Sequence, residues 1–361
     1  MGCASPETVM NIVDKQALAY SCSDKDKYYL VGEIEGAKIR LAFVKNQNIM
    51  AKGRYLIDEH PTIVTALLKF MKKYDINKVN YCCLALAGLV EDGTCEMTNE
   101  HTNYVYDCQD FSVELNCPVS FINDFAAIGC GIQSHFWDQI QKEQFSRSAA
   151  ASDTAVYLGA GSGLGLGFIV NGMVYPTEGG HMRYSAASEV EFALVAYLCH
   201  DLGTKHVSFE RLLSGAGIGA LYDFFSGRPI SALAAFCGVE STDAREVREV
   251  LKADMRHNLK ARYISEQSHS CEVAALVMRA FLTVLARFIA EVVALFDPAR
   301  VIICGGIVAK NTHLLDAAMV GVLTGACAGR ELTLVKDEEV SLFGCFAHIQ
   351  RLDAGVTKAP Q

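Results

Sequence analysis

The chain has 361 residues, which is long enough for two domains with separate hydrophobic cores. Hydrophobic residues make up 51% and charged residues 20% of it, a balance that excludes global disorder. The net charge of -9 argues against nucleic acid as a partner, because binding a phosphate backbone needs a basic face. The fourteen cysteines are scattered, and no secretory signal starts the chain. We therefore expect buried reduced thiols and a cytoplasmic protein.

Residues 1–27 carry little apolar periodicity, and we expect them to form an N-terminal arm. Short apolar runs then predict strands over 28–31, 41–44, 79–86, 119–122, 155–158, 166–170, 173–175 and 301–304. The first run is closed by Gly32, and a hairpin is expected between it and the second. Helical spacing predicts helices over 62–74 and 271–296. Strands alternating with helices, in two similar halves, indicate the α/β class.

The most apolar stretch is the one from Cys271 to Phe296. It contains Glu272, Arg279 and two further charged residues, which are costly inside a bilayer. We therefore expect a buried core helix and no membrane partner.

A glycine-rich run, LGAGSGLG, follows a predicted strand at 158–165. Glycines let backbone amides approach and point at phosphate oxygens. The spacing fits neither a dinucleotide-binding turn that opens a helix nor a P-loop. From this run alone, a tight hairpin without a ligand is an equal alternative. The pair Gly305-Gly306, placed between a predicted strand and a predicted helix, favours a nucleotide site.

Three acidic segments could hold a polyhydroxyl ligand. Asn123 and Asp124 end a predicted strand, where a carboxylate can accept a hydroxyl proton. Glu178 and His181 flank two glycines, and Glu210 precedes a small-residue run. Each has an ordinary alternative: Asp124 as a helix N-cap, His181 as a surface or metal-binding histidine, and Glu210 as a capping-box residue.

These motifs occur in one order along residues 28–352. They are MTNEHT (97–102), INDFAA (122–127), LGAGSGLG (158–165), TEGGH (177–181), SFERLLSGAG (208–217), ICGGIV (303–308) and LFGCFAH (342–348). In that order they resemble the bacterial-type glucokinases, non-zinc group, of the actin/hexokinase/Hsp70 superfamily. The resemblance implies an α/β fold of two actin-like ATPase (ribonuclease H-like) domains around a deep cleft. The expected domains are 28–134, completed by a C-terminal helix at 341–361, and 135–340.

The resemblance also implies the site residues. Those for glucose are Asn99, Asn123, Asp124, Glu178, His181 and Glu210, with Asp124 as the general base on the 6-hydroxyl. Those for ATP are Gly159, Gly161, Ser162, Gly163, Gly305 and Gly306, together with Glu33, Gly36, Lys38 and Arg40 of a first phosphate turn. Mg²⁺ would accompany ATP and could contact Glu33. Met182-Arg183-Tyr184 follows TEGGH in place of the zinc-binding cysteines of a related group, so no structural zinc is expected.

The first phosphate turn departs from the family's DxGGTxxR pattern. Glu33 keeps a carboxylate, whereas Glu35 replaces a glycine and adds negative charge where the terminal phosphate approaches. Ala37 removes a hydroxyl donor, while Lys38 and Arg40 could partly offset the added charge. An uncompensated carboxylate near a γ-phosphate costs several kcal/mol, roughly, at intermediate dielectric. Reduced turnover is therefore one expectation.

The resemblance favours a transferase of glycolysis, an ATP-dependent glucokinase that makes glucose 6-phosphate. The alternatives are a sugar-binding regulatory protein, because the first phosphate turn is altered, and a kinase with another donor or hexose. A homodimer is common among similar kinases. Asp124, the second phosphate turn and the adenosine glycines together favour the enzyme, because a protein that only binds sugar would have no need of all three.

Overall fold

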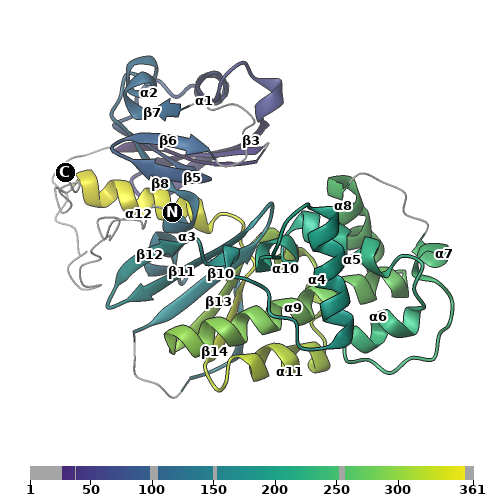
Figure 1. Ribbon diagram of the computed structural model, residues 1–361. Helices are drawn as coiled ribbons and strands as arrows, with labels where there is room; N and C mark the ends of the chain where they lie inside the picture. Colours follow the sequence, from purple (N-terminus) through teal and green to yellow (C-terminus); the bar gives the residue numbers. More distant parts are fainter. Residues whose placement is uncertain (1–26, 37, 98–104, 149–152, 252–256, 354–361) are drawn as a thin grey trace. The chain divides into compact units, whose positions relative to one another are not determined.

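The computed structural model describes residues 27–36, 38–97, 105–148, 153–251 and 257–353. Within them the chain folds as a mixed α/β protein that divides into two compact units (Figure 1). The first unit comprises residues 27–141, 167–176 and 337–353, and the second comprises 142–166 and 177–336. Residues 1–26, the expected N-terminal arm, lie outside the described residues.

The first unit is built on a five-stranded sheet. Its strands run in the order β3 (Asn48–Leu56), β2 (Lys38–Lys45), β1 (Tyr28–Glu35), β4 (Tyr81–Leu86) and β8 (Val119–Asn123). The first three strands pair antiparallel, and β1, β4 and β8 pair parallel. The predicted hairpin between the first two strands is confirmed.

The position expected for the end of the first strand is wrong. β1 runs through Gly32 to Glu35, and the chain turns at Gly36, whose φ is +54°. Gly32 instead serves packing, because a Cβ built there would lie 2.7 Å from the Leu84 side chain and 2.8 Å from that of Leu41. Glu33 and Arg40 consequently lie in strands.

Side chains alternate between the two faces of this sheet, as the two-residue period of a strand requires. Leu30 and its neighbours pack with α1 (Ile63–Lys73) and α2 (Cys108–Leu115). Val31 and its neighbours pack with α3 (Asp124–Gln133) and α12 (Val340–Asp353), which Figure 1 shows on one side of the sheet. The C-terminal helix therefore completes the core of the first unit. A small antiparallel sheet, β5 (Gly88–Glu91), β6 (Thr94–Met97) and β7 (Val105–Asp107), belongs to the same unit.

The second sheet has six strands. Their order is β12 (Met173–Thr177), β11 (Leu164–Val170), β10 (Ala155–Ala160), β13 (Arg300–Cys304), β14 (Glu331–Val335) and β9 (Lys142–Ser146). β10, β13 and β14 pair parallel, and β9 adds an antiparallel edge. Asn171 and Gly172, both with positive φ, connect β11 to β12 as the predicted hairpin turn.

The described helices of the second unit are α4 (Glu189–Asp201), α5 (Gly215–Phe225), α6 (Ile230–Phe236), α7 (Val247–Leu251), α8 (His257–Gln267), α9 (Glu272–Phe296), α10 (Gly306–Lys310) and α11 (Ala317–Ala326). Among them α9 packs against α5, α6, α8 and α11. Of the described helices it is the one long and apolar enough to cross a membrane, but 72% of its apolar window is buried. The predicted buried core helix is confirmed.

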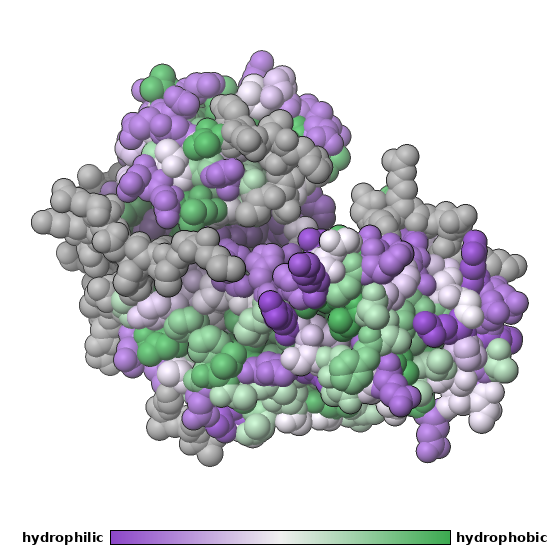
Figure 2. Space-filling model, in the orientation of Figure 1, coloured by the Kyte–Doolittle hydropathy of each residue, from purple (hydrophilic) through white to green (hydrophobic). Residues whose placement is uncertain are grey.

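The described surface is mixed in character. On the face drawn in Figure 2, hydrophobic residues lie among hydrophilic ones. Large exposed apolar side chains include Val113, Phe192 and Leu295, which belong to three different helices. Scattered apolar residues of this kind are usual on protein surfaces. The described cysteines are free thiols, and most of them are buried.

Candidate functional site

The end of β8 positions the predicted general base. Asn123 is the N-cap of α3: its Oδ1 accepts a hydrogen bond from the Ala126 N–H at 3.0 Å, and its Nδ2 donates to the Gly88 carbonyl at 3.0 Å. Asp124 is the first helical residue, and its Oδ1 accepts from the Phe125 N–H at 2.9 Å. The alternative in which Asp124 is the cap is therefore wrong. A carboxylate at this position is favoured by the positive end of the helix dipole.

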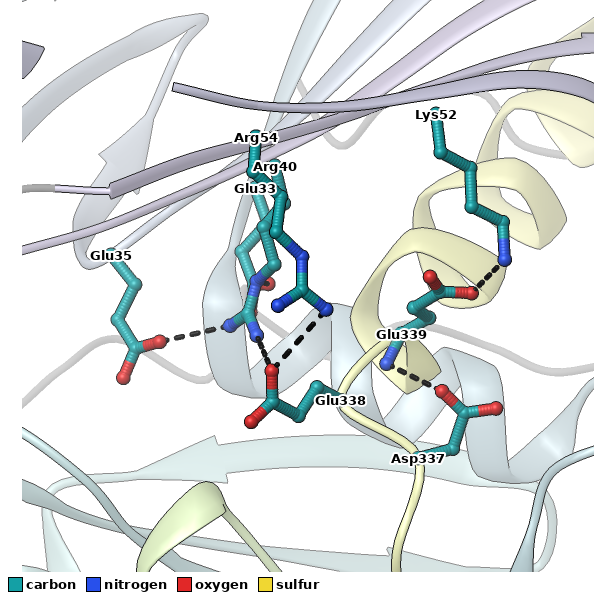
Figure 3. A network of polar contacts seen from close by, with 8 residues as sticks. All are labelled: Glu33, Glu35, Arg40, Lys52, Arg54, Asp337, Glu338 and Glu339. Atoms are coloured by element: carbon teal, nitrogen blue, oxygen red, sulfur yellow. Dashed lines mark hydrogen bonds and ion pairs between the residues drawn. The ribbon is translucent and has the colours of Figure 1, made fainter. Parts of the chain in front are cut away.

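The first phosphate turn forms an ion-pair cluster in the first unit (Figure 3). Glu33 and Arg40 are directly opposite each other across the β1–β2 pair, and Arg40 Nε lies 2.6 Å from Glu33 Oε2. The same guanidinium reaches Glu35 at 2.9 Å and Glu338 at 3.5 Å. Arg40 therefore serves three carboxylates of its own chain, which limits the charge it can offer a phosphate.

Glu33 is buried, with 5% of its surface exposed. Burial raises the pKa of Glu33 from its ordinary value of 4.5 to about 7, against the attraction of Arg40, and the charges of Glu35 and Asp124 raise it further. A magnesium ligand needs an ionised, accessible carboxylate. Glu33 is buried, only partly ionised at neutral pH and already paired, so it does not fit as a direct Mg²⁺ ligand.

The remaining residues of this turn are more open. Lys38 is exposed and lies opposite Glu35 in the strand register. A Cβ built on Gly36 would meet no atom within 4 Å. Ala37 lies outside the described residues.

The sequence gives no local signal for the acidic segment that completes this cluster. Glu338 lies 3.5 Å from Arg54 as well as from Arg40, and Glu339 pairs with Lys52 (Figure 3). This segment leads into α12 and fastens it to β2 and β3. Each contact joins residues almost 300 positions apart, so only the fold brings them together.

The second phosphate turn lies between β10 and β11. The Gly161 N–H donates to the Gly163 carbonyl at 2.9 Å, and Ser162 at the tip is exposed. The Gly161 carbonyl accepts from the Gly215 N–H at 3.0 Å, which ties the turn to the start of α5. Gly159 belongs to β10, beside Cys304 of β13. The turn is thus short and held from one side by a helix N-terminus.

The expected sugar residues of the second unit come together at the same turn. Glu210 Oε2 accepts from the Leu164 N–H at 3.1 Å, and Glu210 Oε1 lies 3.9 Å from His181 Nδ1. His181 Nε2 lies 3.6 Å from Glu178 Oε2. A Cβ on Gly180 would lie 1.9 Å from the Leu164 carbonyl oxygen, so the TEGGH segment needs glycine to approach β11.

The capping-box interpretation of Glu210 is wrong. Ser208 precedes the short 3₁₀ helix Phe209–Arg211 but makes no side-chain cap hydrogen bond. The Glu210 carboxylate instead contacts the phosphate turn, as described above.

The second glycine pair lies where β13 meets α10. Gly305 has φ +93°, and a Cβ there would lie 2.7 Å from the Ala160 carbonyl oxygen and 2.9 Å from its nitrogen. Gly306 opens α10. Only glycine permits this approach of β13 to the end of β10, next to the phosphate turn.

The expected sugar residues are divided between the two units, and one of them is not described. Asn123 and Asp124 belong to the first unit, whereas Glu178, His181 and Glu210 belong to the second. Asn99 lies outside the described residues. Among the residues that the structure describes, no three His, Cys, Asp or Glu side chains group as metal ligands.

Comparison with known proteins identifies the family. The family model described as glucokinase matches residues 30–320, most of the chain. The chain belongs to the glucokinase family. A relative within the family, the glucokinase of Nostoc sp. (strain PCC 7120), is 32% identical over 235 residues, which are 62% of this chain and 65% of the relative. The chain thus matches slightly less than two thirds of that relative's length.

Solved structures show the family's fold. The glucokinase of Balamuthia mandrillaris, solved in complex with glucose, has a TM-score of 0.66 at 19% identity and covers 89% of this chain and 93% of its own. A ROK family glucokinase of Streptomyces griseus, solved with glucose and AMPPNP, has a TM-score of 0.61 at 18% identity and covers 89% and 98%. The fold is therefore the two-domain actin-like kinase fold expected from the motifs.

Proposed function

We propose that this protein transfers the γ-phosphoryl group of ATP to the 6-hydroxyl of glucose. One observation carries the proposal: Glu178, His181 and Glu210 gather at the glycine turn, and Glu210 accepts a hydrogen bond from the backbone of Leu164, the first residue after the turn. A group of hydroxyl-binding side chains joined to a phosphate-sized turn fits a sugar kinase. Membership of the glucokinase family, and solved family folds that hold glucose and AMPPNP, support this substrate pair.

In this proposal Asp124 is the general base. Its carboxylate, at the N-terminus of α3, would take the proton of the 6-hydroxyl as that oxygen attacks the γ-phosphorus. Asn123 keeps one amide N–H beyond the bond to Gly88 and could donate it to a sugar oxygen. Asn99, Glu178, His181 and Glu210 would hold the other hydroxyls. ATP would arrive as its magnesium complex, with the ion carried by the phosphates.

The nucleotide would be held mainly by the second unit. The turn residues Gly161, Ser162 and Gly163 would face phosphate, and Gly305-Gly306 would lie beside the adenosine. The first turn contributes less, because Arg40 already serves three carboxylates. We therefore propose an enzyme with weaker ATP binding than a family member whose first turn is intact. A cytoplasmic location is proposed from the scattered cysteines, and a homodimer from the family resemblance.

A sugar-binding regulatory protein is the second candidate. The observation that favours it is the pairing of Arg40 with Glu33 and Glu35 in the first phosphate turn. A protein that does not transfer phosphate has no need of a cation that is free to bind phosphate at this turn.

Two measurements on the purified protein separate the candidates. A coupled assay with glucose, ATP and Mg²⁺ should give turnover that is lost in Asp124→Ala, and calorimetry should give glucose binding by both proteins. Equal turnover by Asp124→Ala would exclude Asp124 as the base. Glucose binding without turnover, using ATP, ADP, pyrophosphate or polyphosphate as donors, would favour the regulatory protein.

A further inference from the structure

We propose that Glu210 is a positioning residue for the nucleotide as well as a sugar ligand, so that it couples glucose binding to ATP binding. The inference rests on the proposed function for the identity of the two ligands. It is argued from one carboxylate whose two oxygens contact two different segments of the chain.

The geometry of Glu210 assigns one oxygen to each segment. Oε2 accepts the Leu164 N–H at 3.1 Å, at the point where the phosphate turn enters β11. Oε1 faces His181 of the TEGGH segment, 3.9 Å away. Hydrogen bonds to ionised groups are among the stronger ones in proteins. The carboxylate therefore fixes where the turn ends while it faces the sugar-binding histidine.

The backbone around Glu210 holds it in this position. The 3₁₀ helix Phe209–Arg211 leads to Ser214, whose Oγ accepts from the Gly217 N–H as the N-cap of α5. The Gly215 N–H in turn donates to the Gly161 carbonyl at 3.0 Å. The segment that carries Glu210 is thus hydrogen-bonded to both sides of the phosphate turn. The bond to Gly161 is made by backbone, and the bond to Leu164 is made by the Glu210 side chain.

Gly163 provides an independent view of the same contact. A Cβ built there would lie 2.7 Å from Glu210 Oε2, closer than such contacts occur. Gly163 is not among the described glycines with positive φ, so the contact with Glu210 is the obstacle to a side chain that the structure shows there. The glycine therefore leaves room for the Glu210 carboxylate, and a methyl group at 163 would push that carboxylate away from Leu164.

Reciprocal coupling follows from this arrangement. A sugar that fixes the Glu210 carboxylate also fixes the end of the phosphate turn, and a bound phosphate returns the same effect on the sugar. Coupling between sites in proteins commonly amounts to about 5- to 150-fold in affinity. Here we expect about tenfold, the value of one charge-assisted hydrogen bond.

The first test measures nucleotide binding in the absence of sugar, by calorimetry with AMPPNP and Mg²⁺. Glu210→Ala should weaken binding by about tenfold, because the Leu164 N–H loses its acceptor. Glu210→Gln keeps an oxygen for that N–H and should retain most of the affinity. A sugar ligand with no positioning role would leave the AMPPNP Kd unchanged in both variants, and that result would overturn the inference.

The second test needs no change at Glu210 itself. Gly163→Ala should weaken glucose binding, although residue 163 is assigned to the phosphate, and should reduce the gain in glucose affinity that AMPPNP gives. Gly325→Ala in α11 is the matched control, because a Cβ there meets no atom within 4 Å. An unchanged glucose Kd in Gly163→Ala, beside wild-type protein that binds glucose, would overturn the inference. Failure of the wild-type protein to bind glucose would overturn the proposed function instead.

Discussion

Removing the Glu33 carboxylate should change how stability depends on pH. The pKa of Glu33 is about 7 in the folded protein and 4.5 ordinarily. Below pH 4.5 the group is protonated in both the folded and the unfolded chain. As pH rises toward 7, the unfolded chain releases this proton while the folded chain keeps it, so stability is lost. In Glu33→Gln this loss is absent.

The size of the effect follows from the two pKa values. A shift of one pH unit in pKa corresponds to 1.36 kcal/mol, so the interval from 4.5 to about 7 corresponds to about 3 kcal/mol. Between these limits the free energy of unfolding of the wild-type protein should fall by that amount relative to Glu33→Gln. Above pH 7 the difference should become constant.

Urea denaturation of both proteins from pH 4.5 to 8.5, followed by circular dichroism, measures the difference. A second variant checks the cause. The charge of Arg40 lowers the pKa of Glu33, so replacing Arg40 by Gln should extend the fall in stability to higher pH. A difference between wild type and Glu33→Gln that does not vary with pH, or that grows in favour of the wild type, would refute the reasoning.

Three other substitutions test separate parts of the structure. Glu35→Gly should lower the apparent KM for ATP, because one carboxylate leaves the first phosphate turn; an unchanged or higher KM would contradict this. Lys260→Met removes the cation 2.6 Å from Asp223 between α8 and α5, and urea denaturation should show a loss of about 2 kcal/mol, since Lys260 is buried and Asp223 partly exposed. An unchanged midpoint of urea denaturation would show that the Lys260–Asp223 pair does not stabilise the fold. Gly305→Ala forces a residue with a side chain to adopt φ +93° and should raise the KM for ATP more than the KM for glucose. Equal changes in the two KM values would contradict the assignment of Gly305 to the nucleotide site.

Periodicity predicted the buried elements because burial itself produces the pattern. The run at 301–304 is apolar throughout, and it forms β13 in the middle of the second sheet. The stretch 271–296 packs one long helix into the core. The edge strand β9 (Lys142–Ser146) was not predicted, because its sequence KEQFS has no apolar run and its strand form depends on pairing with β14.

The site was predictable where short segments determine it and less so where distant segments meet. The strand before Asn123 and Asp124 was predicted, but which of the two caps the helix depends on backbone geometry, and the structure assigns Asn123. The partners of Arg40 show which contacts could not be predicted from the sequence. Glu33 lies opposite it in a hairpin, whereas Glu338 is 298 residues away and is found only in the folded chain.

Detection of the product tests the central claim most directly. Purified protein incubated with glucose and the magnesium complex of ATP should yield glucose 6-phosphate, identified by phosphorus NMR. Asp124→Asn should lower kcat by about 10²- to 10⁴-fold, the usual contribution of a general base, while calorimetry shows that it still binds glucose. Absence of any sugar phosphate from the wild-type reaction, or an unchanged kcat in Asp124→Asn, would contradict the account.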